Sequence, residues 1–249
     1  MTNPIRKAIN TLRYEGLAPL IKKGVPFIYD NYILKLLPRS IIRYNGVDVR
    51  AGWLFDTTLP WREGHRPKYE SAIMSSISQH VSKRDDVVIV GGGWGVTAVG
   101  AAKQTGSSGS VTVYEGARRE VERVKDTISL NGVSNTVHVE HAIVGSDVHL
   151  KSESGDARQI RPDELPECDV LELDCEGAEI MILEDLDFYP KYLIVESHGL
   201  YDAPTSEVQK TIESMPYSIL STEIAVDDYS EDCIKYDIYV VTARRVQSN

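Results

Sequence analysis

The stretch VVIVGGGWGVTAVGAAK at 87–103 constrains the fold more than any other part of the chain. Its first four residues are β-favouring and apolar, as in a central parallel strand that is buried on both faces. Four glycines follow within five positions, and an alanine-rich segment with helical character comes next. Glycines permit positive φ and the close approach of a ligand to the backbone. We therefore expect a strand, a ligand-binding turn and a helix, and we favour this over a turn that serves packing alone.

Strands and helices alternate through the rest of the chain. Further strands are expected at 110–115, 136–141, 169–174 and 192–197, with two more in YSILST and YDIYVVT; helices are expected from 68, at 96–103, from 117, at 178–186 and at 206–215, the last capped by Thr205 or Ser206. Residues 145–167 are polar and irregular, with a short hairpin at 148–150. This order predicts an α/β, Rossmann-like fold with a mainly parallel seven-stranded sheet and helices on both faces. Ligands bind such sheets at the carboxyl ends of the strands, where the strand order reverses.

We expect two domains, an N-terminal extension at 1–67 and a ligand-binding domain at 68–249. Prolines divide the first forty residues into short helices, and a hairpin is expected around Asn45-Gly46. Residues 1–50 hold nine Lys/Arg against three acids, a balance of +6 in a chain whose net charge is −10. Basic and apolar residues interleave there, so peripheral contact with an anionic membrane is one interpretation. A packed subdomain with snorkelling lysines is the interpretation we favour.

The composition limits the binding partners and the cellular compartment that we expect. The net charge of −10 argues against non-specific nucleic-acid binding. No run of 18 apolar residues predicts a transmembrane helix, and the first residues lack the apolar core of a signal peptide. Three cysteines without metal-type spacing fit a reducing cytoplasm, so we expect a cytoplasmic protein.

Glu115 strengthens the interpretation of the glycine turn as a ligand site. It ends the second expected strand, 22 positions after Gly93, where a carboxylate can accept both hydroxyls of an adenosine ribose. Enzymes that use NAD and enzymes that use S-adenosylmethionine both need this, so Glu115 indicates adenosine binding without choosing the cofactor. The alternative is a solvent-exposed acid at a strand end.

Four segments together carry a family resemblance. They are GGGWG at 91–95, YEGA at 114–117, LNGVSN at 130–135 and LELDCEGAE at 171–179. With them the chain resembles the FkbM-like family of class I S-adenosylmethionine-dependent methyltransferases over about residues 68–200. The resemblance implies methyl transfer from S-adenosylmethionine to a hydroxyl, most plausibly on a sugar of a glycan or a glycan-lipid precursor. Two departures stand out, namely Gly91 where such enzymes commonly carry an acid, and the bulky Trp94.

The resemblance also implies a cofactor site. Its residues are Gly91, Gly92, Gly93, Trp94, Gly95, Glu115, Gly116, Ala142, Ile143, Asp174 and Glu70. Ala142 and Ile143 would line the adenine, near His141, and Glu70 would reach the methionine end of the cofactor.

Catalytic residues are expected at the ends of the fourth and fifth strands. His198 would accept the proton of the attacking hydroxyl, Glu196 would orient its ring, and Asp174 would face the substrate. The alternative for His198 is a loop histidine bonded to backbone. Glu179 is expected to serve only the charge of a helix N-terminus. No metal is expected, because no complete ligand set is visible; a cation between Asp174 and another carboxylate is the less favoured alternative.

Two rival functions remain open at this point. An NAD(P)-dependent oxidoreductase would explain the glycine turn and Glu115. A non-catalytic methyltransferase-fold binding subunit would explain the missing acid at Gly91, and it would tolerate replacement of Asp174 and His198.

Overall fold

The computed structural model describes residues 4–59, 61–62, 64–145 and 153–246. The chain divides into two compact units, one formed by Met1–Ile42 with Arg50–His65 and the other by Arg43–Val49 with Arg66–Asn249. Within the described residues, no helix is long and apolar enough to span a membrane.

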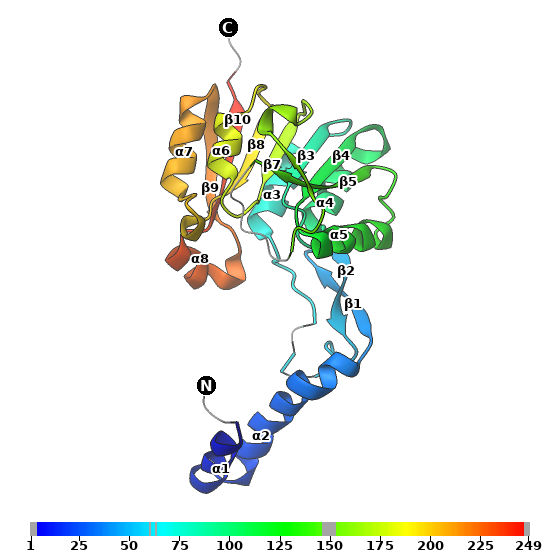
Figure 1. The fold of residues 1–249 in the computed structure, drawn as a ribbon, viewed down its shortest axis with the longest axis vertical. Coiled ribbons are helices and arrows are strands. Elements are labelled where there is room, and N and C mark those ends of the chain that lie inside the picture. Colours follow the sequence, from blue (N-terminus) through cyan, green and yellow to red (C-terminus); the bar gives the residue numbers. More distant parts are fainter. Residues whose placement is uncertain (1–3, 60, 63, 146–152, 247–249) are drawn as a thin grey trace. The chain divides into compact units, whose positions relative to one another are not determined.

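The smaller unit consists of helices and part of a hairpin (Figure 1). Its elements are α1 (Pro4–Tyr14), α2 (Leu17–Ile28), two short helical turns at Tyr29–Ile33 and Leu34–Leu36, and the hairpin strands β1 (Arg39–Tyr44) and β2 (Val47–Trp53). Tyr29 anchors this unit, because its hydroxyl donates to the Leu54 carbonyl at 2.9 Å and its ring meets Trp61 edge-on. The favoured expectation of a packed subdomain is not met for α2, in which no residue is buried.

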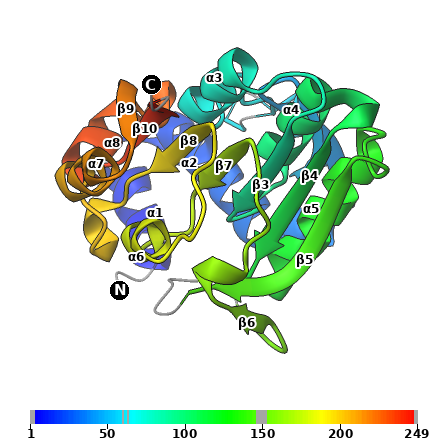
Figure 2. The same cartoon turned by 90° about the horizontal axis from the view of Figure 1, so that it is seen from above.

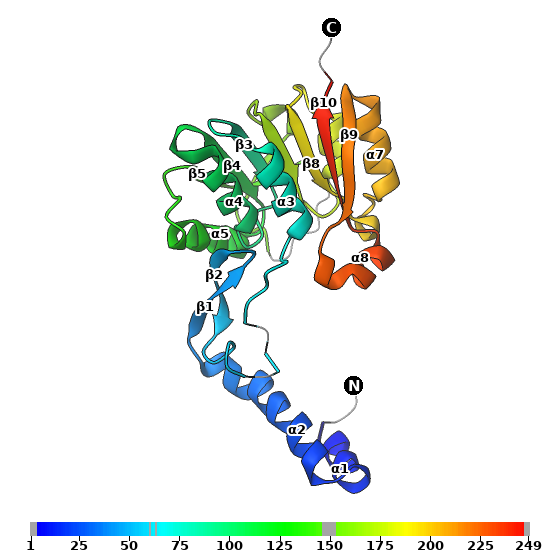
Figure 3. The ribbon, with the colours of Figure 1, turned by 180° about the vertical axis from the view of Figure 1, so that it is seen from behind.

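The larger unit holds the sheet and its helices (Figures 1 and 3). In chain order they are α3 (Ser71–His80), β3 (Asp86–Val90), α4 (Val96–Thr105), β4 (Ser110–Glu115), α5 (Arg118–Leu130), β5 (Val137–Val144), β6 (Arg158–Ile160), β7 (Val170–Leu173), α6 (Glu179–Glu184), β8 (Tyr192–Glu196), α7 (Thr205–Ser214), β9 (Tyr217–Ile224), α8 (Ser230–Tyr236) and β10 (Tyr239–Arg245). The spatial order is β6-β5-β4-β3-β7-β8-β10-β9, with β10 antiparallel to both neighbours. Seen from above, α3, α4 and α5 cover one face of the sheet, and α6 and α7 cover the other (Figure 2).

The predicted fold class is confirmed, since the sheet is mainly parallel and doubly wound around β3. The predicted number of seven strands is wrong, because eight strands pair within the described residues. The additional strand, β6, lies in the segment that was expected to be irregular, and it pairs with Ala142–Val144 of β5. Helix α8 was not predicted, and the hairpin expected at 148–150 lies outside the described residues.

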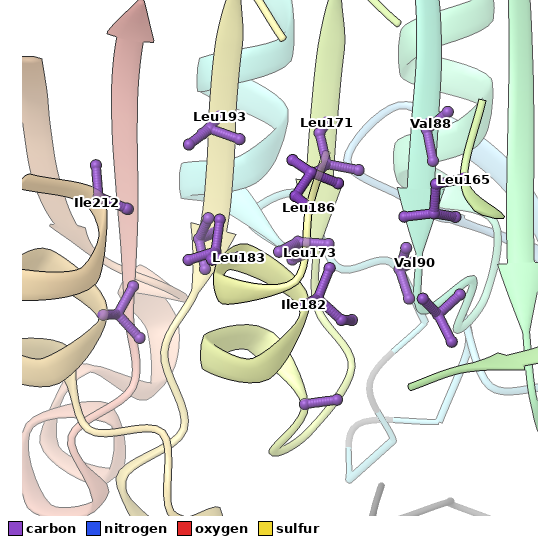
Figure 4. Close-up of a cluster of buried hydrophobic side chains, with 14 of the residues drawn as sticks. Val88, Val90, Leu165, Leu171, Leu173, Ile182, Leu183, Leu186, Leu193 and Ile212 are labelled. Atoms are coloured by element: carbon purple, nitrogen blue, oxygen red, sulfur yellow. The ribbon is translucent and has the colours of Figure 1, made fainter. Parts of the chain in front are cut away.

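The apolar core explains how β7 presents acids to the opposite face. Leu171 and Leu173 pack with Ile182 and Leu183 of α6 in one cluster (Figure 4). Since successive side chains of a strand point to opposite faces, Glu172 and Asp174 point away from this cluster. The register pairs Leu173 with Val195, which places the next positions, Asp174 and Glu196, side by side.

Candidate functional site

The glycine turn links β3 to α4 at the switch point between β4 and β7. Gly91, Gly93 and Gly95 have φ of 100°, 50° and 75°. A Cβ on Gly91 would lie 1.8 Å from the backbone oxygen of Asp174. The absence of an acid at position 91 therefore has a local cause, because no side chain fits between the turn and the end of β7.

Glu115 is buried and ties the end of β4 to this turn, so the alternative of a solvent-exposed acid is wrong. Its Oε2 accepts hydrogen bonds from the amides of Gly92 at 2.8 Å and Gly93 at 3.1 Å, and its Oε1 accepts one from Ala117 at 2.7 Å. Gly116 lies between Glu115 and Ala117 in the chain. Burial raises the pKa of Glu115, and the three backbone donors oppose that shift. A carboxylate accepts about four hydrogen bonds, so capacity remains for a ligand hydroxyl.

The side chain of Trp94 packs in an aromatic cluster beside the glycine turn. Its ring meets Tyr44 edge-on at 5.9 Å, and the Arg123 guanidinium lies over it at 4.3 Å. Tyr44 in turn stacks on Tyr69 at 4.6 Å.

Ala142 and Ile143 lie within β5, not in a loop beyond it. Their backbones pair with β6, and the Ala142 side chain belongs to the apolar core. The neighbouring His141 has a buried Nε2 that finds no hydrogen-bond partner among the described residues. The adenine placement stays a prediction, and His141 is the polar group beside it.

Asp174, Glu196 and His198 come together at the carboxyl ends of β7 and β8. His198 Nε2 lies 3.4 Å from Asp174 Oδ1 and 3.5 Å from Glu196 Oε1. The His198 backbone amide donates to the Ala203 carbonyl, and His198 is almost fully buried. His198 therefore faces two carboxylates in addition to its backbone hydrogen bond, unlike the loop histidine of the alternative interpretation.

Glu179 completes the surroundings of His198, which the sequence analysis did not anticipate. Its Oε1 lies 2.9 Å from His198 Nδ1, closer than either other acid. The same carboxylate accepts hydrogen bonds from the amides of Cys175 and Gly177. The ring is therefore oriented chiefly by Glu179 and not by Glu196 as expected. The EGAE sequence that follows β7 was the available signal, because it places this acid at the start of α6.

The charge state of His198 does not fit the expected general-base role. Burial alone would lower its pKa, but hydrogen bonds to Glu179 and Glu196 and the charge of Asp174 raise it to about 11. Burial would likewise raise the pKa of Glu179, but the His198 hydrogen bond and charge lower it instead. An imidazolium at neutral pH has no lone pair with which to accept a proton.

Two further acids, Glu172 and Glu70, lie near the glycine turn and the residues around His198. Glu172, in the middle of β7, is fully buried, and its Oε2 has no hydrogen-bond partner among the described residues. Burial raises its pKa well above the ordinary value, and the charges of Glu70, Asp174 and Glu196 add to the shift. The Glu70 carboxylate lies 3.8 Å from where a Cβ on Gly93 would stand. A charged residue inside the apolar run VLEL was the signal for Glu172.

Comparisons with known proteins find distant structural likenesses. No family model and no curated protein matches the chain. A ribosomal protein L11 methylase from Lactobacillus delbrueckii subsp. bulgaricus is 13% identical over 72% of this chain and 79% of its own, with a TM-score of 0.49. A SAM-dependent O-methyltransferase from Thermotoga maritima is 17% identical over 85% and 79%, with a TM-score of 0.47. TYW2 from M. jannaschii, in complex with AdoMet, is 15% identical over 84% and 88%, with a TM-score of 0.46. Likenesses this distant leave the function to be argued from the chain's own residues.

Proposed function

We propose that this chain is an S-adenosylmethionine-dependent methyltransferase that methylates a hydroxyl. The observation that carries the proposal is the glycine turn at the switch point, tied to β4 by Glu115 and flanked by the Glu70 carboxylate and the Asp174 backbone. The family resemblance of the four motifs supports the same activity.

The two ends of the cofactor match the two sides of the turn. Glu115 would accept a hydrogen bond from a ribose hydroxyl, while Gly92 and Gly93 would let the adenosine approach the backbone. Glu70 and Asp174 would face the methionine ammonium and the sulfonium, because acids stabilise neighbouring positive charge. Glu70 would thereby replace the acid that cannot fit at Gly91.

Methyl transfer breaks the bond between sulfur and methyl carbon as the bond between carbon and the acceptor oxygen forms. The hydroxyl also loses its proton, and a base that takes this proton as the bond forms accelerates the reaction. Because His198 is an imidazolium in this geometry, we assign the carboxylates of Asp174 and Glu196 as the groups that accept the hydroxyl proton. The remaining contribution is the positioning of donor and acceptor.

The acceptor is proposed from the resemblance to be a sugar hydroxyl of a glycan or a glycan-lipid precursor. The rival oxidoreductase rests on the turn and Glu115 alone and gives the acids around His198 no role. The rival binding subunit is weakened, because steric exclusion by Asp174, not loss of function, accounts for Gly91.

The smaller unit offers a means of reaching a lipid-linked acceptor. Large apolar side chains of α2 and the turn after it are exposed, among them Leu17, Ile21, Val25, Phe27, Ile28 and Leu36. Exposed lysines stand between them, including Lys22, Lys23 and Lys35. Apolar side chains interleaved with cations suit the surface of an anionic membrane. We therefore propose peripheral membrane contact through this unit.

Isothermal titration with S-adenosylmethionine and S-adenosylhomocysteine tests the cofactor, with NAD⁺ and NADPH as controls. We expect roughly micromolar binding of the first pair alone. Glu115→Ala should abolish that binding, and Glu122→Ala, at an exposed acid of α5, should leave it unchanged. Binding of only a nicotinamide cofactor would move the chain to the oxidoreductases. If none of the four ligands binds, the non-catalytic binding subunit would be favoured.

A further inference from the structure

We propose that Asp174, Glu196 and His198 bind a divalent transition-metal ion at the carboxyl edge of the sheet. The inference goes beyond methyl transfer, because the site would bind the ion without any cofactor. It also revises the sequence-based expectation that no metal is bound.

The spacing of the three groups is that of ligands around one ion. One ligand atom from each residue lies within 4.8 Å of the other two. His198 Nε2 stands 3.4 Å from Asp174 Oδ1 and 3.5 Å from Glu196 Oε1. Bonds near 2.1 Å place adjacent ligand atoms about 3.0 Å apart in an octahedral shell and about 3.4 Å apart in a tetrahedral one. The two distances fit this spacing.

The ring of His198 is held in the orientation that a ligand needs. Its Nδ1 side is fixed by the fully buried Glu179 carboxylate at 2.9 Å, which leaves Nε2 to face Asp174 and Glu196. Metal-binding histidines commonly donate their other ring N–H to a carboxylate in this way, which sets the tautomer and strengthens the ligand. The His198 ring, an imidazolium without metal, would release its Nε2 proton to solvent as the ion binds. Two backbone amides hold Glu179 in turn, so the support is rigid.

Glu172 adds a second observation on this side of the sheet. It lies on the same face of β7 as Asp174, and its Oε2 is buried without a hydrogen-bond partner among the described residues. A buried polar atom that lacks a partner is costly, and a nearby cation reduces that cost. The ion would supply this compensation.

The donor set indicates which ions to test. Two carboxylates and one imidazole suit Mn²⁺, Fe²⁺ or Zn²⁺ better than Mg²⁺, which prefers oxygen ligands alone. Three protein ligands leave positions open for water or for a hydroxyl. If the proposed function holds, the ion would lower the pKa of the acceptor hydroxyl at the place where the methyl group arrives.

Binding of Mn²⁺ to the EDTA-treated, dialysed full chain tests the site, without S-adenosylmethionine in the buffer. We expect one equivalent to bind at pH 7.5, measured from the loss of the free-ion EPR signal. Glu196→Gln and His198→Gln should each weaken binding at least about tenfold. The matched control is His138→Gln, which alters an exposed histidine that pairs with Glu140 at 2.7 Å and should bind like wild type.

A measurement on the unaltered protein covers the case that a variant does not fold. Pulsed EPR of the bound Mn²⁺ should show coupling to the ¹⁴N nucleus of an imidazole. Absence of this coupling, absence of binding by wild type, or full binding by both folded variants would each overturn the proposal. Failure of the cofactor titration with intact Mn²⁺ binding would instead count against methyl transfer alone.

Discussion

His198 owes its charge to the number of acids around it and not to its burial. Three carboxylates face the two ring nitrogens, and together they outweigh a burial that on its own favours the neutral ring. The consequence for stability depends on pH. A raised pKa contributes stability in full below the unfolded pKa, near 6.5, and this contribution is lost as the pH rises through the folded value of about 11.

The stability difference between metal-free wild type and His198→Gln should therefore shrink as the pH rises from 6.5 to 9.5. The slope is expected to reach up to about 1.4 kcal/mol per pH unit. Urea unfolding at a series of pH values measures it. His138→Gln, at an exposed site, should show no comparable trend. A constant difference across this range would mean that His198 is neutral throughout.

Gly91 allows a second prediction at the residue scale, because steric overlap and backbone strain can be separated. Gly91→Ala introduces a Cβ that would overlap the Asp174 carbonyl, at a φ of 100°. Gly132→Ala places a Cβ at a φ of 68° with nothing within 4 Å. We expect about 1–2 kcal/mol of destabilisation for Gly132→Ala and about 3 kcal/mol or more for Gly91→Ala. Denaturant unfolding compares them, and equal losses would refute the steric explanation of Gly91.

At the scale of elements, helix α7 shows how a distant residue supplies a local need. The sequence predicted that Thr205 or Ser206 caps this helix, but the helix begins at Thr205 after Pro204, and no side chain at the cap position bonds to it. The Asp237 carboxylate accepts hydrogen bonds from the Thr205 amide at 2.9 Å and from its hydroxyl at 2.7 Å. Asp237 also ends α8 in a left-handed conformation, so one residue terminates one helix and caps another.

Asp237→Ala should consequently destabilise the protein by about 1–2 kcal/mol, since it removes two acceptors at a helix start. Ser206→Ala, at the exposed neighbouring position, should change the free energy of unfolding by less than about 0.5 kcal/mol. Thermal or urea unfolding of both variants provides the comparison. A larger loss from Ser206→Ala would return the cap to the predicted residue.

At the scale of the whole molecule, charge is divided between the two units. The smaller unit carries most of the basic residues of the N-terminal region, in a chain of net charge −10. Its exposed apolar side chains therefore stand among cations. This combination favours an anionic lipid surface over a neutral one, because adjacent lysines add about 1 kcal/mol each near such a surface.

The full chain should accordingly sediment with phosphatidylserine-containing vesicles and only weakly with phosphatidylcholine vesicles. Lys22→Glu with Lys35→Glu should reduce binding at least about tenfold. The same reversal at Lys125 and Lys210, which lie in α5 and α7, should not reduce it. Equal binding to both vesicles would contradict the proposal. Self-association in light scattering without vesicle binding would assign the apolar residues to a second copy.

The sequence by itself determined the order of elements around the glycine turn and the position of Glu115 at the end of β4. These follow from local pattern, because strand and helix periodicity and the placement of glycine act over a few neighbouring residues. It did not reveal β6, since three residues that pair at a sheet edge leave no period to detect.

Only the tertiary structure decided the partners of the site residues. The contact of Glu179 with His198 joins positions 19 apart, and the carbonyl that excludes a side chain at Gly91 belongs to Asp174. The charge of His198 likewise depends on Asp174 and Glu179, which lie beyond the end of another strand. Burial and electrostatic coupling arise when distant segments meet, so no local pattern encodes them.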